Sequence, residues 1–339
     1  FSLVSTSLIA SDKLETNNYF FFFKHSVYIC IGIAILIFFS SLSEENLFKL
    51  SIILFFVFVF TLFLVSIIGV EVKGSKRWLD LFFLPRFQPI ELVKPFTIIF
   101  LATILSTKKN LNIYYKYFLS FITIVPISFL LMMQPDIGQT LLIFLSWLTL
   151  VFISGISLLF FLSFFSFSII SLFYLVFFID KFEYIKNRIL SFLNPTNGTH
   201  NFQSEKAIDS ITSGGFFGKG IGEGTLKNRV PEAHTDYIVS VISEEFGVVV
   251  IILLLILFLF FIYLVFKRIY FEQNEKIKLV LVGTMTLIIL QALIHIGVNI
   301  RLFPTTGMTL PFLSYGGSSI VGVSILSGII LNLTKRKII

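Results

Sequence analysis

Residues 230–266 read VPEAHTDYIVSVISEEFG followed by VVVIILLLILFLFFIYLVF, which is a cluster of acidic side chains at the start of a long apolar run. About 20 apolar residues, at roughly 1.5 Å each, cross the hydrocarbon core of a bilayer, so this run predicts a membrane-spanning helix. A carboxylate inside such a span costs ~2.5 to 3.5 kcal/mol on insertion scales. The acidic residues here therefore need a partner, water or a chemical role.

Eight further runs have the length and composition of membrane spans. They lie at 20–42, 48–70, 88–106, 112–133, 137–154, 157–179, 279–300 and 310–334. Residues 1–10 are apolar but short and lack the basic start of a signal peptide, so we interpret them as the end of a further helix. We expect an all-α, polytopic inner-membrane bundle with ten helices in the intact protein, forming one transmembrane domain over 1–339.

The composition agrees with this class. Of 339 residues, 56% are hydrophobic, 13% are charged and 44 are phenylalanine, which is more apolar surface than a water-soluble fold can bury. The one cysteine, Cys30, rules out a disulfide framework, and the four histidines never have the i, i+4 spacing of a helical zinc site. We expect no metal ligands and no bound cofactor, and we leave a requirement for divalent cations open.

Basic residues in alternate short loops place those loops in the cytoplasm. The opposite side then holds a large extracytoplasmic loop at 180–236 and a second basic stretch at 72–86. Positive charge on that side indicates an anionic ligand, although contact with lipid head groups explains a single lysine equally well. Within the large loop, GGFFGKGIGEG at 214–224 has six glycines whose backbone can approach a phosphate, or which simply make the loop flexible.

Asp236 is the candidate catalytic residue of this region. If the helix begins near Thr235, Asp236 faces a polar stripe and Glu245 points the opposite way. A carboxylate in the first turn can also act only as a helix cap. Capping does not explain why Glu232 and His234 cluster with Asp236 beside a basic loop, a setting in which carboxylates serve as general bases.

A second group of charges lies at 86–96, RFQPIELVKPF, where Glu91 and Lys94 are three positions apart on a predicted span. We expect them to form an ion pair, which lowers the cost of insertion and is the favoured role of Glu91. Lys94 can also reach an anionic group in a cavity and form a diphosphate clamp with Arg77. Trp78 fits an anchor at the membrane interface better than a platform for a sugar.

Two further segments, QPDIGQT at 134–140 and PTTGMTLPFLSYGGSS at 304–319, interrupt apolar runs with proline, glycine and hydroxyl groups. Such breaks occur where helices turn at a cavity or pack closely. Small residues at 316–319 allow close packing, so neither Ser318 nor Ser319 is assigned as a nucleophile.

Six motifs in one order resemble the SEDS family of polytopic glycosyltransferases for shape, elongation, division and sporulation, which polymerise lipid II into peptidoglycan. They are GSKRWLDL (74–81), QPIELVK (88–94), QPDIGQTLL (134–142), SGGFFGKGIGEG (213–224), PEAHTDYIVSVISEEFG (231–247) and PTTGMTLPFLSYGGSS (304–319). The chain resembles the division members, FtsW, more than the elongation members, RodA. It departs from the family where Ile90 replaces the serine of the common QPSE motif, and where Arg301 lies in a stretch that is often neutral.

The resemblance implies an inverting transfer between two undecaprenyl-pyrophosphate-linked glycans, with Asp236 as the general base. Arg77, Lys94, Lys227 and Arg229 would hold the leaving pyrophosphate, while His234 and Glu245 orient and pack. The candidate substrate contacts are Arg77, Trp78, Gln88, Glu91, Lys94, Lys227, Arg229, Glu232, His234, Glu245 and Ser314.

The implied partners are lipid II, the growing lipid-linked strand, a class B penicillin-binding transpeptidase and other divisome proteins, at the bacterial inner membrane and the division septum. Nucleic acid is not expected. The alternatives are a flippase that moves lipid II without chemistry, an elongation polymerase, and a scaffold for division proteins. A flippase needs no base at the outer mouth, and a scaffold would leave Asp236 replaceable.

Overall fold

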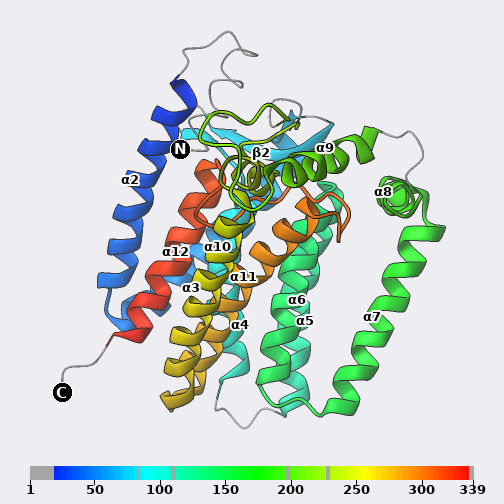
Figure 1. Ribbon diagram of the computed structural model, residues 1–339. Helices are drawn as coiled ribbons and strands as arrows, with labels where there is room; N and C mark the ends of the chain where they lie inside the picture. Colours follow the sequence, from blue (N-terminus) through cyan, green and yellow to red (C-terminus); the bar gives the residue numbers. More distant parts are fainter. Residues whose placement is uncertain are drawn as a thin grey trace. The chain divides into compact units, whose positions relative to one another are not determined.

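The computed structural model describes residues 19–335, with gaps at 73, 82–83, 108–111, 195–198 and 227–229. Within these residues the chain is predominantly helical, which confirms the predicted all-α membrane class (Figure 1). The predicted helix at 1–10 lies outside the described residues.

Seven described helices are long and apolar enough to cross a bilayer: α2 (Phe20–Ser41), α3 (Glu44–Ile68), α5 (Ile113–Met133), α7 (Leu158–Phe178), α10 (Ile238–Phe271), α11 (Glu275–Asn299) and α12 (Gly317–Thr334). Two helices of 17 residues, α4 (Pro89–Leu105) and α6 (Ile137–Ile153), are shorter. The bounds follow the predicted spans within a few residues except at the last one. There α12 begins at Gly317 rather than at 310, because 304–316 runs as a loop in which Gly307 and Phe312 have positive φ.

The predicted large loop contains helices of its own. A short 3₁₀ helix, η1 (Asp180–Phe182), leads into α8 (Glu183–Leu193), and α9 (Thr199–Gly214) follows. The described residues between α9 and α10, 215–226 and 230–237, contain mostly turns and bends.

A small antiparallel sheet between α3 and α4 was not predicted from the sequence. It has the order β1 (Val70–Val72), β2 (Ser75–Leu81), β3 (Leu84–Phe87). Val70 pairs with Trp78, and the turn between β1 and β2 contains Gly74 at φ +77°. Strands of three, seven and four residues are too short for their alternation to stand out beside long apolar spans.

By internal contacts the chain divides into two compact units. The first unit comprises 1–30, 172–261 and 289–316, and the second comprises 31–171, 262–288 and 317–339. The single domain over 1–339 stays a prediction.

In the second unit, α4 is buried along most of its length between α3 and α12. The two charged side chains that α4 carries in this buried position, Glu91 and Lys94, pair with each other, and Gln139 of α6 also binds Glu91. The carbonyl groups at the end of α2 also receive a partner from another helix. Asn332 of α12 donates from Nδ2 to the carbonyl oxygens of Phe39 (2.9 Å) and Leu42 (2.7 Å). Terminal carbonyls of a helix have no partner within the helix, and a bilayer supplies none.

Candidate active site

Asp236 lies in a turn, not in a helix. Residues 231–237 form successive turns and α10 begins at Ile238, so the start near Thr235 that the sequence predicted is wrong by three residues. Asp236 therefore does not share a helical face with the serines that follow it. Asp236 is neither buried nor fully exposed, so part of this residue is accessible to solvent.

The backbone of Glu232 organises this turn. Its carbonyl oxygen accepts hydrogen bonds from the amides of Thr235, Asp236 and Tyr237 at 3.0, 3.1 and 3.3 Å. Glu232 has φ +53°, a left-handed conformation that costs a non-glycine residue about 1 to 3 kcal/mol and is found mainly where the surroundings enforce it. Thr235 Oγ1 also donates to Glu232 Oε2 at 3.4 Å. Glu232, a predicted substrate contact, thus helps to shape the turn that carries Asp236.

Asn299, at the end of α11, fixes the turn from the opposite side. This side chain is fully buried, and its Nδ2 donates to the carbonyl oxygens of Asp236 (3.0 Å) and His295 (2.9 Å). Its Oδ1 accepts from the amide of Ser240 at 3.2 Å. One amide side chain therefore joins Asp236 to the first turn of α10 and to α11. Asn299 was not singled out from the sequence, where it is only one polar residue at the end of an apolar span.

The loop at 304–316 also holds this turn by hydrogen bonds. Ser314 Oγ donates to the carbonyl oxygen of Thr235 at 2.6 Å and accepts from the amide of Leu310 at 2.8 Å. The amide of Tyr315 donates to the carbonyl oxygen of His234 at 2.9 Å. Ser314 was predicted as a substrate contact. In the structure its hydroxyl is hydrogen-bonded to the backbone of Thr235 and to that of Leu310.

His234 lies against two aromatic rings. Its ring centroid is 5.7 Å from those of Phe21 and Tyr315. Burial raises the pKa of Tyr315 to about 12, so its hydroxyl stays protonated at physiological pH. The orienting role of His234 stays a prediction, and in the structure its ring packs against these two aromatic side chains.

Tyr237 lies beside Asp236 with its side chain buried. Burial raises the pKa of Tyr237, the negative charge of Asp236 raises it further, and the positive charge of Arg188 on α8 lowers it. Asp236 and Arg188 are therefore both close enough to act on the same hydroxyl. Arg188 was not singled out from the sequence, where it was one of several basic residues in a long loop.

The two glutamates that follow bind the glycine-rich segment. Glu244 is fully buried and accepts hydrogen bonds from Ser210 Oγ (2.8 Å) and the amide of Leu226 (2.9 Å). Glu245 Oε1 accepts from the amide of Gly222 at 3.3 Å. Glu245 thus accepts from one amide of the glycine-rich segment, and Glu244 accepts from an amide just beyond it. The geometry of Glu245 fits the packing role predicted for it.

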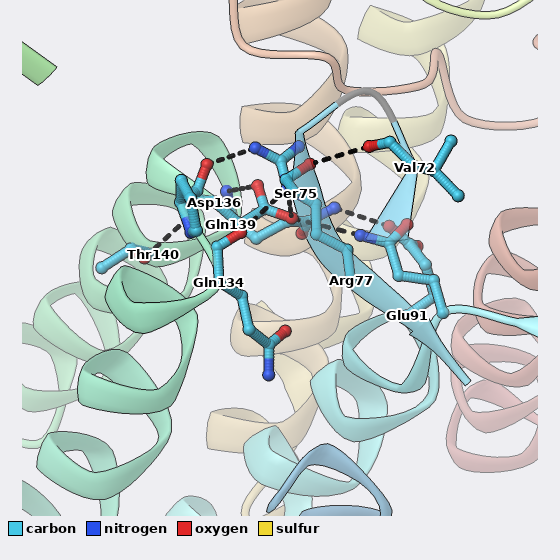
Figure 2. Close-up of polar contacts among 10 residues, drawn as sticks. Val72, Ser75, Arg77, Glu91, Gln134, Asp136, Gln139 and Thr140 are labelled. Atoms are coloured by element: carbon cyan, nitrogen blue, oxygen red, sulfur yellow. Dashed lines mark hydrogen bonds and ion pairs between the residues drawn. The ribbon is translucent and has the colours of Figure 1, made fainter. Parts of the chain in front are cut away.

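In the second unit, polar side chains from β2, α4 and α6 converge (Figure 2). Arg77 donates from Nε to the carbonyl oxygen of Gln134 (3.1 Å) and from Nη2 to that of Pro135. The Arg77 Nε lies 3.7 Å from Asp136 Oδ2, which also accepts from Gln88 Nε2 at 3.1 Å. Arg77 is therefore held against the turn that precedes α6.

The predicted ion pair within α4 is confirmed. Lys94 Nζ lies 2.8 Å from Glu91 Oε2, with both side chains buried. Gln139 Nε2 donates to the other carboxylate oxygen, Glu91 Oε1, at 2.6 Å, and the amide of Gln139 lies 3.4 Å from Asp136 Oδ1. The two acids are thus linked through one glutamine (Figure 2).

Asp136 is a buried carboxylate whose importance the sequence reasoning missed. Burial raises the pKa of Asp136, while the guanidinium of Arg77 and the amide of Gln139 lower it. The available signal was the order of residues in QPDIGQT, since an aspartate directly before an apolar helix is a favoured N-cap, and Asp136 caps α6. The segment was instead interpreted only as a break.

The predicted site residues fall into separate groups. The first unit holds Glu232, His234, Asp236, Glu245 and Ser314, and the second holds Arg77, Trp78, Gln88, Glu91 and Lys94. Lys227 and Arg229 lie outside the described residues. In the part of the chain that the structure describes, no three His, Cys, Asp or Glu side chains cluster as metal ligands.

Residues 1–338 match a protein family, described as "Cell cycle protein", of FtsW, RodA and SpoVE. The chain is 29% identical to the probable peptidoglycan glycosyltransferase FtsW of Caulobacter vibrioides, over 98% of this chain and 84% of that protein. It is 33% identical to the protein of the same name from Buchnera aphidicola subsp. Schizaphis graminum, over 94% of this chain and 92% of that protein.

Solved structures are similar over almost the whole chain. A chain from a peptidoglycan synthase complex, described as coordinating polymerization and crosslinking, aligns with a TM-score of 0.81 at 25% identity, covering 98% of this chain and 93% of that one. The rod shape determining protein RodA of Thermus thermophilus aligns with a TM-score of 0.67 at 26% identity, covering 98% and 92%.

Asn299 and Ser314 each hydrogen-bond the turn that carries Asp236, and their loss should change the exchange of different amides. Asn299→Ala removes one of the two acceptors of the Ser240 amide and leaves the carbonyl oxygen of Tyr237 at 3.1 Å. That amide should therefore exchange faster, by up to about fivefold for a lost hydrogen bond of about 1 kcal/mol. Ser314→Ala should do the same to the amide of Leu310. Each variant is the control for the other in hydrogen–deuterium exchange. Equal exchange in both variants and the wild type would show that these side chains do not hold the turn.

Arg77→Gln should destabilise the protein in a pH-dependent way. It leaves the buried Asp136 without its cation, at a cost of about 3 to 5 kcal/mol when the carboxylate is ionised. A carboxyl whose native pKa is raised stabilises the fold at low pH, and this stability is lost as the pH rises through the native pKa. The deficit in unfolding midpoint against wild type should therefore be largest at pH 8 and shrink towards pH 5.

Asp136→Asn in the Arg77→Gln background supplies the control for this effect. Measured against Asp136→Asn alone, where no group at 136 titrates in either protein, the double variant should show a constant deficit across the same pH range. A deficit in Arg77→Gln that grows as the pH falls would contradict the assignment.

Proposed function

The chain belongs to the FtsW, RodA and SpoVE family of cell cycle proteins, and from this premise we propose that it polymerises lipid II with Asp236 as the general base. Its curated relatives are named probable peptidoglycan glycosyltransferases. The chain matches them over nearly their full length. The chain is accordingly a multi-pass membrane enzyme of peptidoglycan synthesis. These relatives are named FtsW, which agrees with the resemblance of the chain to the division members of the family.

The proposed reaction is an inverting glycosyl transfer. The carboxylate of Asp236 accepts the proton of the GlcNAc 4-hydroxyl of lipid II. The oxygen attacks the anomeric carbon of the growing strand, a new glycosidic bond forms, and lipid pyrophosphate leaves with the electrons of the broken bond. General-base action of this kind contributes about 10² to 10⁴ in rate. No bound cofactor takes part in this proposal.

The observation that carries the proposal is the way in which the backbone of Asp236 is fixed. Its amide donates to the carbonyl of Glu232, and its own carbonyl accepts from Asn299. The peptide groups on both sides of the side chain are therefore held, while the residue itself stays partly accessible. A positioned base in a preorganised setting avoids reorganisation during the reaction, which is a main source of catalytic rate.

The leaving pyrophosphate needs positive charge. Arg77 and Lys94 are the proposed clamp, and Lys227 and Arg229 are further candidates outside the described residues. Both described cations are held by internal partners, Arg77 by carbonyl groups and Lys94 by Glu91. Arg188 adds a cation in the same unit as Asp236, and we include it among the groups that stabilise developing negative charge.

A penicillin-binding partner is supported by the solved complex, which is described as joining polymerization and crosslinking. We propose a class B transpeptidase that crosslinks the strands as they form, with other divisome proteins around the pair. The proposed location is the division septum of the bacterial inner membrane. A flippase for lipid II remains the rival function, and a test of glycan formation separates it from a polymerase.

Asp236→Asn should abolish polymerisation of labelled lipid II by the purified protein, alone or with its transpeptidase partner. The loss should be at least about 10²-fold, since the amide cannot accept the proton. The matched control is Asp209→Asn, an exposed acid on α9 in the same unit that pairs with Lys206. It should keep the wild-type rate. Glycan strands made at the wild-type rate by the Asp236 variant would remove this residue from the mechanism.

A further inference from the structure

The long helix α10 is broken at Gly247, where φ is +77° and ψ is −179°. A break leaves the amides of the next turn without helical partners. The amide of Val248 donates instead to the carbonyl of Gly215 (3.0 Å) and that of Val249 to the carbonyl of Phe216 (3.3 Å). The loop at 215–222 therefore caps the second half of α10 with its own backbone.

The break coincides with the edge of the hydrocarbon core. The apolar run at 248–266 has 19 residues and ends at Lys267 and Arg268. At about 1.5 Å per residue this run is roughly 28 Å long, close to the ~30 Å of a bilayer core. Because the run fills the core, Gly247 lies at its boundary. The 215–222 loop is bonded to residues at and just inside that boundary.

The loop is held closely against α10. The amides of Lys219 and Gly220 donate to the carbonyls of Glu244 (2.9 Å) and Glu245 (3.0 Å). Glycine permits this approach, because a Cβ on Gly218 would lie 2.2 Å from the Glu245 carbonyl oxygen and one on Gly247 only 2.1 Å from that of Phe216. A backbone fixed in this way presents its side chains at a defined depth.

Two adjacent phenylalanines project from the fixed loop. Phe216 is 74% exposed and Phe217 is 84% exposed. We propose that the 215–222 loop inserts Phe216 and Phe217 into the hydrocarbon of the bilayer leaflet on its own side, where they anchor α10 at its break.

Phe216 and Phe217 lie in a loop next to exposed apolar residues of α10, which favours lipid hydrocarbon as their surroundings. Val249, whose amide binds Phe216, is itself 47% exposed, and Ile252 and Leu253 continue the exposed apolar surface one turn further along the span. Irregular backbone at membrane depth needs internal hydrogen bonds, and the loop has them.

The test uses the chain of 339 residues alone in proteoliposomes, with Cys30→Ala to remove its one cysteine. Nitroxide labels are attached to Phe216→Cys or Phe217→Cys, and to Glu223→Cys as the matched control, since Glu223 is an exposed polar residue just beyond the loop. Power-saturation spectroscopy then measures how often each label collides with oxygen, which concentrates in lipid, and with a water-soluble nickel chelate. This measurement does not depend on enzymatic activity.

The labels at 216 and 217 should meet oxygen more often than nickel, and the label at 223 should show the opposite order. Nickel collisions at 216 and 217 equal to those at 223 would place the phenylalanines in water and overturn the proposal. Low collision rates with both reagents would overturn it as well, because they would show that protein, such as a second copy of the chain, covers the loop.

Discussion

A bilayer offers no hydrogen-bond partner, so every interruption of a membrane helix has to be satisfied by the chain itself. Each break described here meets this constraint with a particular group. Asn299 and Ser314 bind the turn that carries Asp236, and loop carbonyls cap α10 after Gly247. The same rule applies at the end of α2, where Asn332 takes up terminal carbonyls. The irregular segments are therefore held in place, and a protein that is mostly regular helix can present chemical groups in fixed positions.

The charges follow the same principle in both units. Glu91 is satisfied by Lys94 and Gln139, and Asp136 by Arg77 and Gln88, so these buried ionisable groups of the second unit form a connected network. In the first unit Glu244 accepts from Ser210 and the amide of Leu226, and Glu245 accepts from the amide of Gly222. Asp236 differs from these acids because its residue stays partly accessible while its backbone is fixed. That difference is the physical reason for choosing it as the proton acceptor.

Sequence reasoning recovered what depends on nearby residues. Apolar runs predicted the spans, and a spacing of three positions predicted the pair of Glu91 and Lys94. It failed where partners are distant, as for Asn299, which binds a residue 63 positions away. The start of α10 was misplaced because the turn at 231–237 is set by the carbonyl of Glu232, and residue type does not reveal a left-handed backbone. The short sheet was missed because its strands lie between two long apolar runs.

The central claim is that Asp236 works because Asn299 holds its peptide in place. The most direct measurement is the kcat for lipid II polymerisation by Asn299→Ala, which keeps the carboxylate but frees the turn. A misplacement of about 1 Å can cost 10²-fold, so kcat should fall roughly 10- to 100-fold with KM little changed. A wild-type kcat in a variant whose turn is demonstrably loosened would contradict the account.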